Sequence, residues 1–171
     1  MEDKLNIFSF TGKYRILHLT WFAFFMTFVV WLSLGPMMPF IQEALGLSEQ
    51  QAKVLLILNV AMTIPARIVV GMLVDKIGPK IMFSSILILG GLVSIAFSWM
   101  QSYEQLALLR FLSGFIGAGF VVGIRMISEW FPAKQTGTAQ GIYGGWGNFG
   151  SAGAAVSLPF IAASFGDVDG W

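Results

Sequence analysis

The chain has 171 residues, of which 56% are hydrophobic and only 11% are charged. Because soluble domains carry about 25% charged residues, this composition excludes an ordinary soluble protein and predicts an integral membrane protein of the lipid bilayer. The formal net charge of +1 gives no reason to expect a nucleic acid partner. The chain has no cysteine and a single histidine, so we expect no disulfide, no metal site and no cofactor.

Uncharged runs of roughly 20 residues predict membrane-spanning helices. We expect an all-α membrane protein with five helices, at residues 17–41, 50–74, 81–100, 105–129 and 136–163. Gly35-Pro36 and Pro39 should bend the first helix or end it early, and Ser48 is the expected N-cap of the second.

The distribution of charge between the loops predicts the orientation. Bases concentrate before the first helix and in the second–third and fourth–fifth loops: Lys4, Lys13, Arg15, Lys76, Lys80 and Lys134. The opposite loops carry mostly acids: Glu43, Glu49, Glu104, Asp167 and Asp169. The positive-inside rule therefore places residues 1–16 in the cytoplasm of a multi-pass protein in the cell (inner or plasma) membrane. Because the sequence stops in a polar loop, we expect a fragment of a longer protein; the alternative is a complete small membrane protein.

Arg67 lies inside the uncharged part of the second predicted helix. The nearest acid toward the C-terminus on that helix, Asp75, is eight residues away, about 12 Å along a helix. A guanidinium in a bilayer costs several kcal/mol unless it faces a cavity or a partner. Two interpretations stay open at this point: an anion site on a transport path, or a structural salt bridge between helices.

The fifth predicted helix combines an asparagine with many glycines. Gly141, Gly144 or Gly145, and Asn148 are spaced so that they share one helix face. An asparagine within a membrane span needs hydrogen-bond partners. It either joins two helices or donates to a ligand, flanked by glycines that let a small solute touch the backbone.

The loop between the second and third helices resembles the G-x-x-x-D-[RK]-x-G-x-[RK] loop of the major facilitator superfamily. The matching residues are Gly71, Asp75, Lys76, Gly78 and Lys80, and Arg110 begins an R-x-x-x-G pattern similar to that of the family's fourth helix. The resemblance implies the major facilitator fold, with five of the six helices of its N-terminal half. It also implies that the loop is a gating or structural latch in which Asp75 pairs with basic groups or a helix end and Glu129 joins the network.

Charged residues of the predicted fourth helix also bear on this latch. Arg125 and Glu129 are four residues apart and can pair along the helix. Arg110 is either structural or part of the coupling machinery, and we favour the structural interpretation.

The segment from Ala139 to Gly150 resembles the glycine-rich signature of the nitrate/nitrite porter family within that superfamily. The resemblance implies that Arg67 grips the anion, while Asn148 and the backbone at Gly144, Gly145 and Gly147 supply geometry. In this fold the second and fifth helices are equivalent in two inverted repeats and face one midplane cavity. Three phenylalanines are candidates to sandwich the planar ion, with ordinary packing as the alternative: Phe28, Phe115 and Phe120.

The expected function is secondary transport of nitrate, nitrite or both by alternating access, as nitrate/nitrite antiport or proton-coupled nitrate uptake. The expected partners are the anion, the bilayer and the missing C-terminal half of the same protein. All 9 acids lie at helix ends or in loops, which favours exchange over proton symport. The alternatives are a facilitator for another small anion, such as a carboxylate, and a non-transporting sensor of the same fold. An enzyme is not expected, because no catalytic set of residues stands out.

Overall fold

The computed structural model describes residues 6–165, so Lys4, Asp167 and Asp169 of the orientation argument lie outside the described residues. Along the chain it forms α1 (Gly12–Leu32), α2 (Leu34–Leu45), α3 (Glu49–Ile77), α4 (Pro79–Phe97), α5 (Tyr103–Leu112), the short 3₁₀ helix η1 (Ser113–Ala118), α6 (Gly119–Trp130) and α7 (Ala133–Ser164). The described residues contain no strand, which confirms the all-α prediction.

Helical segments lie at each of the five predicted positions: α1 with α2, α3, α4, α5 with η1 and α6, and α7. Four are long and apolar enough to cross a membrane: Gly12–Leu45, Glu49–Ile77, Pro79–Phe97 and Tyr103–Trp130. The fifth, α7, has 32 residues, but its glycine and polar residues make it less apolar than the other four. Polar and small side chains on a long helix indicate a surface that meets protein or a cavity rather than lipid.

The first helical segment is interrupted at Ser33, between α1 and α2. Pro36 has no N–H to donate, and it lies in the first turn of α2, where no intrahelical donor is needed. The Ser33 hydroxyl donates to the Val30 carbonyl at 2.9 Å. The helix is thus interrupted at Ser33, whose own backbone angles stay helical, and it continues past Pro39 to Leu45. The expected N-cap at Ser48 is also confirmed, as a capping box with Gln51.

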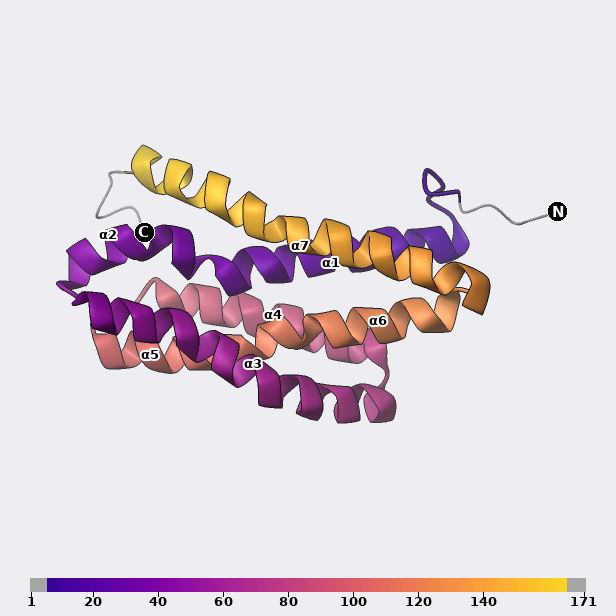
Figure 1. The fold of residues 1–171 in the computed structure, drawn as a ribbon, viewed down its shortest axis with the longest axis horizontal. Helices are drawn as coiled ribbons and strands as arrows, with labels where there is room; N and C mark the ends of the chain where they lie inside the picture. The colour runs from indigo at the N-terminus through magenta and orange to yellow at the C-terminus, as the bar shows by residue number, and fades with distance from the viewer. Residues whose placement is uncertain (1–5, 166–171) are drawn as a thin grey trace.

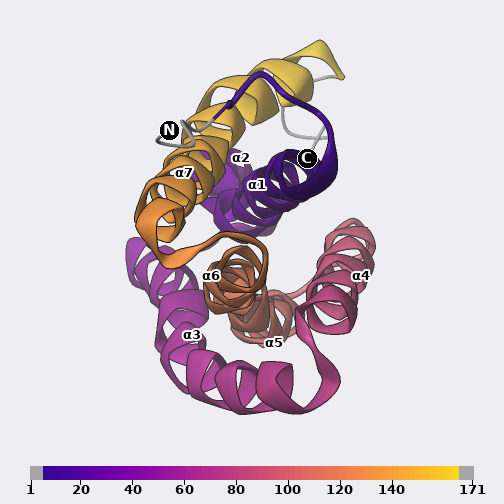
Figure 2. The same ribbon diagram turned by 90° about the vertical axis from the view of Figure 1, so that its right-hand side faces the viewer.

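The helices pack as a bundle in which α7 lies along α1 (Figure 1). Seen end-on, α6 stands between this pair and the helices α3 and α4 (Figure 2). The α3–α4 and α6–α7 connections lie at the same end as the start of α1, and the α2–α3 and α4–α5 connections lie at the other (Figure 1). The basic loops at Lys76, Lys80 and Lys134 are thus gathered at one end of the bundle.

Glycines set how closely the helices approach. A Cβ atom added at Gly147 would collide with the Phe24 ring, and one added at Gly150 would collide with the Phe25 carbonyl, so both glycines admit α1 against α7. Across the bundle, a Cβ at Gly114 would lie 2.7 Å from the Asn59 carbonyl oxygen, which lets η1 press against α3. Close approach of this kind replaces the hydrophobic effect as the source of helix association in lipid.

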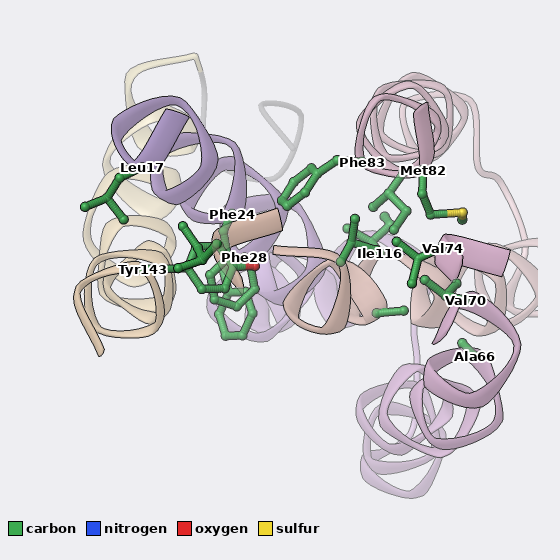
Figure 3. Packing of buried hydrophobic residues seen from close by; sticks show 14 of the residues in the cluster. Leu17, Phe24, Phe28, Ala66, Val70, Val74, Met82, Phe83, Ile116 and Tyr143 are labelled. Carbon is green, nitrogen blue, oxygen red and sulfur yellow. The ribbon is translucent and has the colours of Figure 1, made fainter. Parts of the chain in front are cut away.

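The main core fills the space between these helices with buried apolar side chains. Figure 3 shows part of it: Leu17, Phe24, Phe28, Ala66, Val70, Val74, Met82, Phe83, Ile116 and Tyr143. A second cluster lies between α2, α3 and α5, toward the end of the bundle that holds the α2–α3 and α4–α5 connections. Its buried members are Leu34, Met38, Ile41, Ala52, Leu55 and Leu106.

The glycine contact between α1 and α7 can be tested by adding one methyl group. Gly147→Ala should lower the free energy of unfolding by about 1–3 kcal/mol, because the Phe24 ring must move to admit the new atom. The control is Gly91→Ala on α4, where a Cβ has no neighbour within 4 Å and alanine favours the helix by about 0.5–1 kcal/mol. Melting temperatures of the full-length protein in detergent measure both, and equal stability of the two variants would contradict this packing.

Candidate functional site

Arg67 extends from α3 and is exposed. Its guanidinium carbon lies 5.8 Å from the centre of the Phe120 ring, which projects from α6. Within residues 6–165 Arg67 makes no ion pair and no hydrogen bond, so the structure gives no support to the structural salt bridge. A cation over an exposed ring gains about 0.5–1 kcal/mol and leaves the N–H donors of the fork available to a ligand.

Phe120, on α6, lies between residues of α3 and α7. Besides Arg67, it approaches Gly144, where an added Cβ would lie 3.8 Å from Phe120 Cε2. The Phe120 ring is also 5.7 Å from the ring of Phe24 and 6.2 Å from that of Tyr143. Among the three phenylalanines proposed from the sequence, Phe120 is therefore the one that touches the predicted arginine. Phe28 is buried in the core, where it packs against Phe24 and Trp31, and this agrees with the alternative that it serves ordinary packing.

Asn148 lies one turn after Gly144 on α7. Its side-chain Nδ2 donates to the Gly144 carbonyl at 2.7 Å, within the same helix, and the residue is exposed. The described residues thus show no hydrogen bond from Asn148 to another helix. Through this bond the amide lies beside Gly144, and its exposure leaves it accessible to a small solute.

The other two glycines of the predicted site do not join this surface. The expectation that Gly147 offers open backbone is wrong, because the Phe24 ring occupies the place of its missing side chain and buries it. Gly145 borders a separate hollow beside Trp146 and Phe149. The glycines of α7 therefore divide between two tasks: Gly147 serves packing against α1, and Gly144 lies beside Phe120.

Arg110 contrasts with Arg67, because it is only 2% exposed. Its Nε donates to the Leu55 carbonyl at 3.1 Å and its Nη1 donates to the Trp31 carbonyl at 2.8 Å. The Trp31 carbonyl, next to the interruption between α1 and α2, also accepts from Asn59 Nδ2 at 3.1 Å. Charge-assisted bonds to carbonyl oxygens offset the cost of burying this cation and fasten α5 to α1 and α3. This geometry supports the structural interpretation of Arg110 over a role in coupling.

The latch residues meet at the end of the bundle where α3 and α6 finish. Arg125 Nε lies 3.5 Å from the Asp75 carboxylate and 3.4 Å from that of Glu129, which confirms the predicted pairing. All three side chains are at least 40% exposed, and exposed pairs contribute about 0–1 kcal/mol each. Gly78 has φ +83, a left-handed conformation that glycine adopts without strain, and it turns the chain between α3 and α4. The remaining motif residues lie on α3 or at the start of α4: Gly71, Lys76 and Lys80.

Comparison with known proteins places this geometry in a family context. The family model of the Major Facilitator Superfamily matches residues 20–171. The nitrate/nitrite transporter NrtP of Picosynechococcus sp. is 52% identical over 153 residues, which cover 90% of this chain and 29% of that protein. NrtP of Nostoc punctiforme is 51% identical over 159 residues, covering 93% of this chain and 32% of that protein.

A more distant relative carries a similar name. The probable nitrate/nitrite antiporter NarK1 of Thermus thermophilus is 36% identical over 155 residues, covering 89% of this chain and 34% of that protein. The chain spans about a third of the length of these three relatives. Their names confirm the resemblance to nitrate/nitrite porters that residues 139–150 indicated.

The two arginines should respond differently to the same substitution. Arg110→Lys should lower the free energy of unfolding by about 1.5–3 kcal/mol, because an ammonium cannot serve both carbonyls from the position of the guanidinium fork. Arg67→Lys should change it by less than about 1 kcal/mol, since only the contact with Phe120 is lost. Thermal unfolding of the full-length protein without added anion measures both, and equal losses would make Arg67 a structural residue as well.

Proposed function

Because this chain belongs to the major facilitator superfamily, we propose that it is part of a secondary transporter that moves nitrate, nitrite or both across the membrane by alternating access. The names of the relatives favour these anions over a carboxylate or a sensor function. The relatives are transporters, and the protein is proposed to act without enzymatic chemistry.

The observation that carries the proposal is the Arg67 guanidinium, which stands in a membrane helix, rests on Phe120 and has no acid partner among residues 6–165. Nitrate and nitrite are flat monoanions whose oxygens accept hydrogen bonds. The guanidinium is permanently charged, and its planar fork donates two parallel N–H bonds to such an ion. The planar Phe120 ring then forms an apolar wall beside the bound planar ion.

Asn148 and Gly144 complete the proposed site from α7. The amide of Asn148 supplies a neutral donor or acceptor, and the missing side chain of Gly144 lets a small ion approach the backbone. The site thus combines one charge, one neutral polar group and a shallow wall, which suits a small ion better than a bulky carboxylate. Gly145 and Gly147 are not assigned to the anion, because their positions lie on other faces of α7.

The coupling mode follows from where the acids lie. Within the described residues the carboxylates lie near helix ends or in loops. Proton-coupled carriers commonly keep an ionisable relay inside the membrane, so its absence from the described spans favours exchange of nitrate against nitrite. The proposed setting is the cell membrane, with the basic loops and residues 1–16 in the cytoplasm. The remainder of the full-length protein is the expected partner in transport.

The ion pairs of Arg125 are proposed to form a latch that holds one conformational state. Being exposed, they are weak enough to break and form again during a transport cycle. A latch of this kind controls the rate of the conformational change and leaves the anion site unaltered.

Nitrate uptake into proteoliposomes tests the proposed site. In the full-length protein, Arg67→Lys should weaken the apparent nitrate affinity at least about tenfold, because charge is kept while the fork and the flat contact with Phe120 are lost. Internal nitrite should stimulate uptake by the wild type. Arg15→Lys, an exposed arginine at the start of α1, is the matched control and should behave as wild type.

The other results are also decisive. Uptake that is indifferent to Arg67→Lys would remove Arg67 from the site. No nitrate or nitrite uptake by the wild type would overturn the proposed function and favour another anion or a sensor.

The latch makes a separate prediction for the same assay. Arg125→Gln should change the maximal rate several-fold and leave the nitrate KM within about twofold, because both ion pairs are lost at the end of the bundle, outside the proposed anion site. Lys53→Gln, which breaks a more exposed pair with Glu49 at 3.3 Å at the other end of α3, is the control. A change in KM alone would show that Arg125 acts on binding rather than on the conformational change.

A further inference from the structure

Tyr143 is the largest of the fully buried side chains in the described part of the chain. It precedes Gly144 on α7, and its ring centre lies 6.2 Å from that of Phe120, so it adjoins the proposed anion site. The Tyr143 ring occupies space that only glycine at position 123 leaves open, because a Cβ on Gly123 would collide with it. The Tyr143 side chain is therefore enclosed where α7 packs on α6.

The hydroxyl of Tyr143 ties α7 to the first turn of α6. It donates to the Gly119 carbonyl at 2.9 Å and lies 3.4 Å from the Phe120 carbonyl oxygen. These two residues open α6, directly after the 3₁₀ segment η1, where the helical pitch changes. A bond at this junction fixes the rotation of the turn from which the Phe120 side chain projects.

Ring contacts extend the connection toward the arginine. The Tyr143 ring stacks on Phe24 with centroids 4.6 Å apart and planes inclined by 23°, and Figure 3 shows the two rings together. Phe120 lies 6.2 Å from Tyr143 in a stacked orientation. The guanidinium of Arg67 then lies 5.8 Å from the centre of the Phe120 ring. A continuous series of contacts thus leads from the Tyr143 hydroxyl to the cation.

We propose that Tyr143 is a positioning residue that holds Phe120, and through it the Arg67 guanidinium, in the geometry that binds the anion. The inference rests on the proposed function. Packing alone does not require the hydroxyl, since phenylalanine fills the same space without burying a polar group. The hydroxyl acts through its bond to the α6 backbone, and small misplacements of a binding group have large effects on how well it works.

Tyr143→Phe in the full-length protein tests this role, because it keeps the ring and removes only the donor. In proteoliposomes the nitrate KM should rise about three- to tenfold, and the maximal rate should stay within about twofold. Tyr14→Phe is the matched control: that hydroxyl accepts a bond from the Asn6 amide at 3.0 Å, away from the site, and its loss should leave KM unchanged. In a Phe120→Leu background, Tyr143→Phe should add no further increase in KM, since its effect passes through Phe120.

A second replacement keeps the test decisive if the phenylalanine variant does not assemble. Incorporation of 4-aminophenylalanine at position 143 retains a donor at the same place and should restore the KM to within about twofold of wild type. If this variant assembles and Tyr143→Phe does not, the hydroxyl is a folding contact and the positioning role is overturned. Additive effects of Tyr143→Phe and Phe120→Leu would overturn it as well.

The wild type and Arg67→Lys separate this inference from the proposed function. If the wild type takes up nitrate, Arg67→Lys weakens it, and Tyr143→Phe has a normal KM, then only the positioning role fails. If the wild type takes up no nitrate, the proposed function fails and the positioning role falls with it.

Discussion

The close approach of α7 to α1 is the contact on which the rest of the arrangement depends. Gly147 and Gly150 remove the side chains that would keep the helices apart, and Phe24 enters the space at Gly147. In that position Phe24 stacks on Tyr143, and Tyr143 in turn bonds to the start of α6. The location of Phe120, and hence the surface on which Arg67 rests, is thus linked to the packing of the Phe24 ring on Gly147. A membrane helix that is rich in glycine thus acts here as a means of placing aromatic rings.

Two arginines with the same chemistry take opposite roles because their surroundings differ. Arg110 is buried, and its hydrogen bonds to the Trp31 and Leu55 carbonyls satisfy it. Arg67 is exposed, lies over the Phe120 ring and, within the described residues, makes no hydrogen bond or ion pair. An arginine whose N–H groups already donate to backbone carbonyls has few donors left for a ligand. An arginine that lies over an aromatic ring keeps its N–H donors available. This difference in satisfied hydrogen bonds, more than membership of a motif, separates the structural arginine from the candidate ligand.

The sequence predicted those features that depend on local pattern or spacing. Uncharged runs located the five helical segments, the Ser48 cap followed from the residues that surround it, and the Arg125–Glu129 pair followed from the helical repeat. Features that depend on how one helix is rotated against another were not predictable. Glycine spacing alone does not reveal which face of α7 meets α1, so Gly147 was assigned to the anion although Phe24 covers it. Tyr143 was not identified for the same reason, because nothing in its neighbouring residues points to α6.

The distribution of strong and weak contacts indicates which parts of this bundle move together. Inside the bundle, buried hydrogen bonds hold α3 to α5 and η1: Arg110 donates to the Leu55 carbonyl at 3.1 Å, and the Thr63 hydroxyl donates to the Gly114 carbonyl at 2.9 Å. The ion pairs of Arg125 at the end of the bundle are exposed and weak. Breaking the central contacts would leave buried polar groups unsatisfied, whereas breaking the terminal pairs only exchanges them for water. In the proposed transport cycle the exposed pairs at the end of the bundle are therefore the contacts that can break and form again, whereas the buried bond from Tyr143 to the start of α6 is retained.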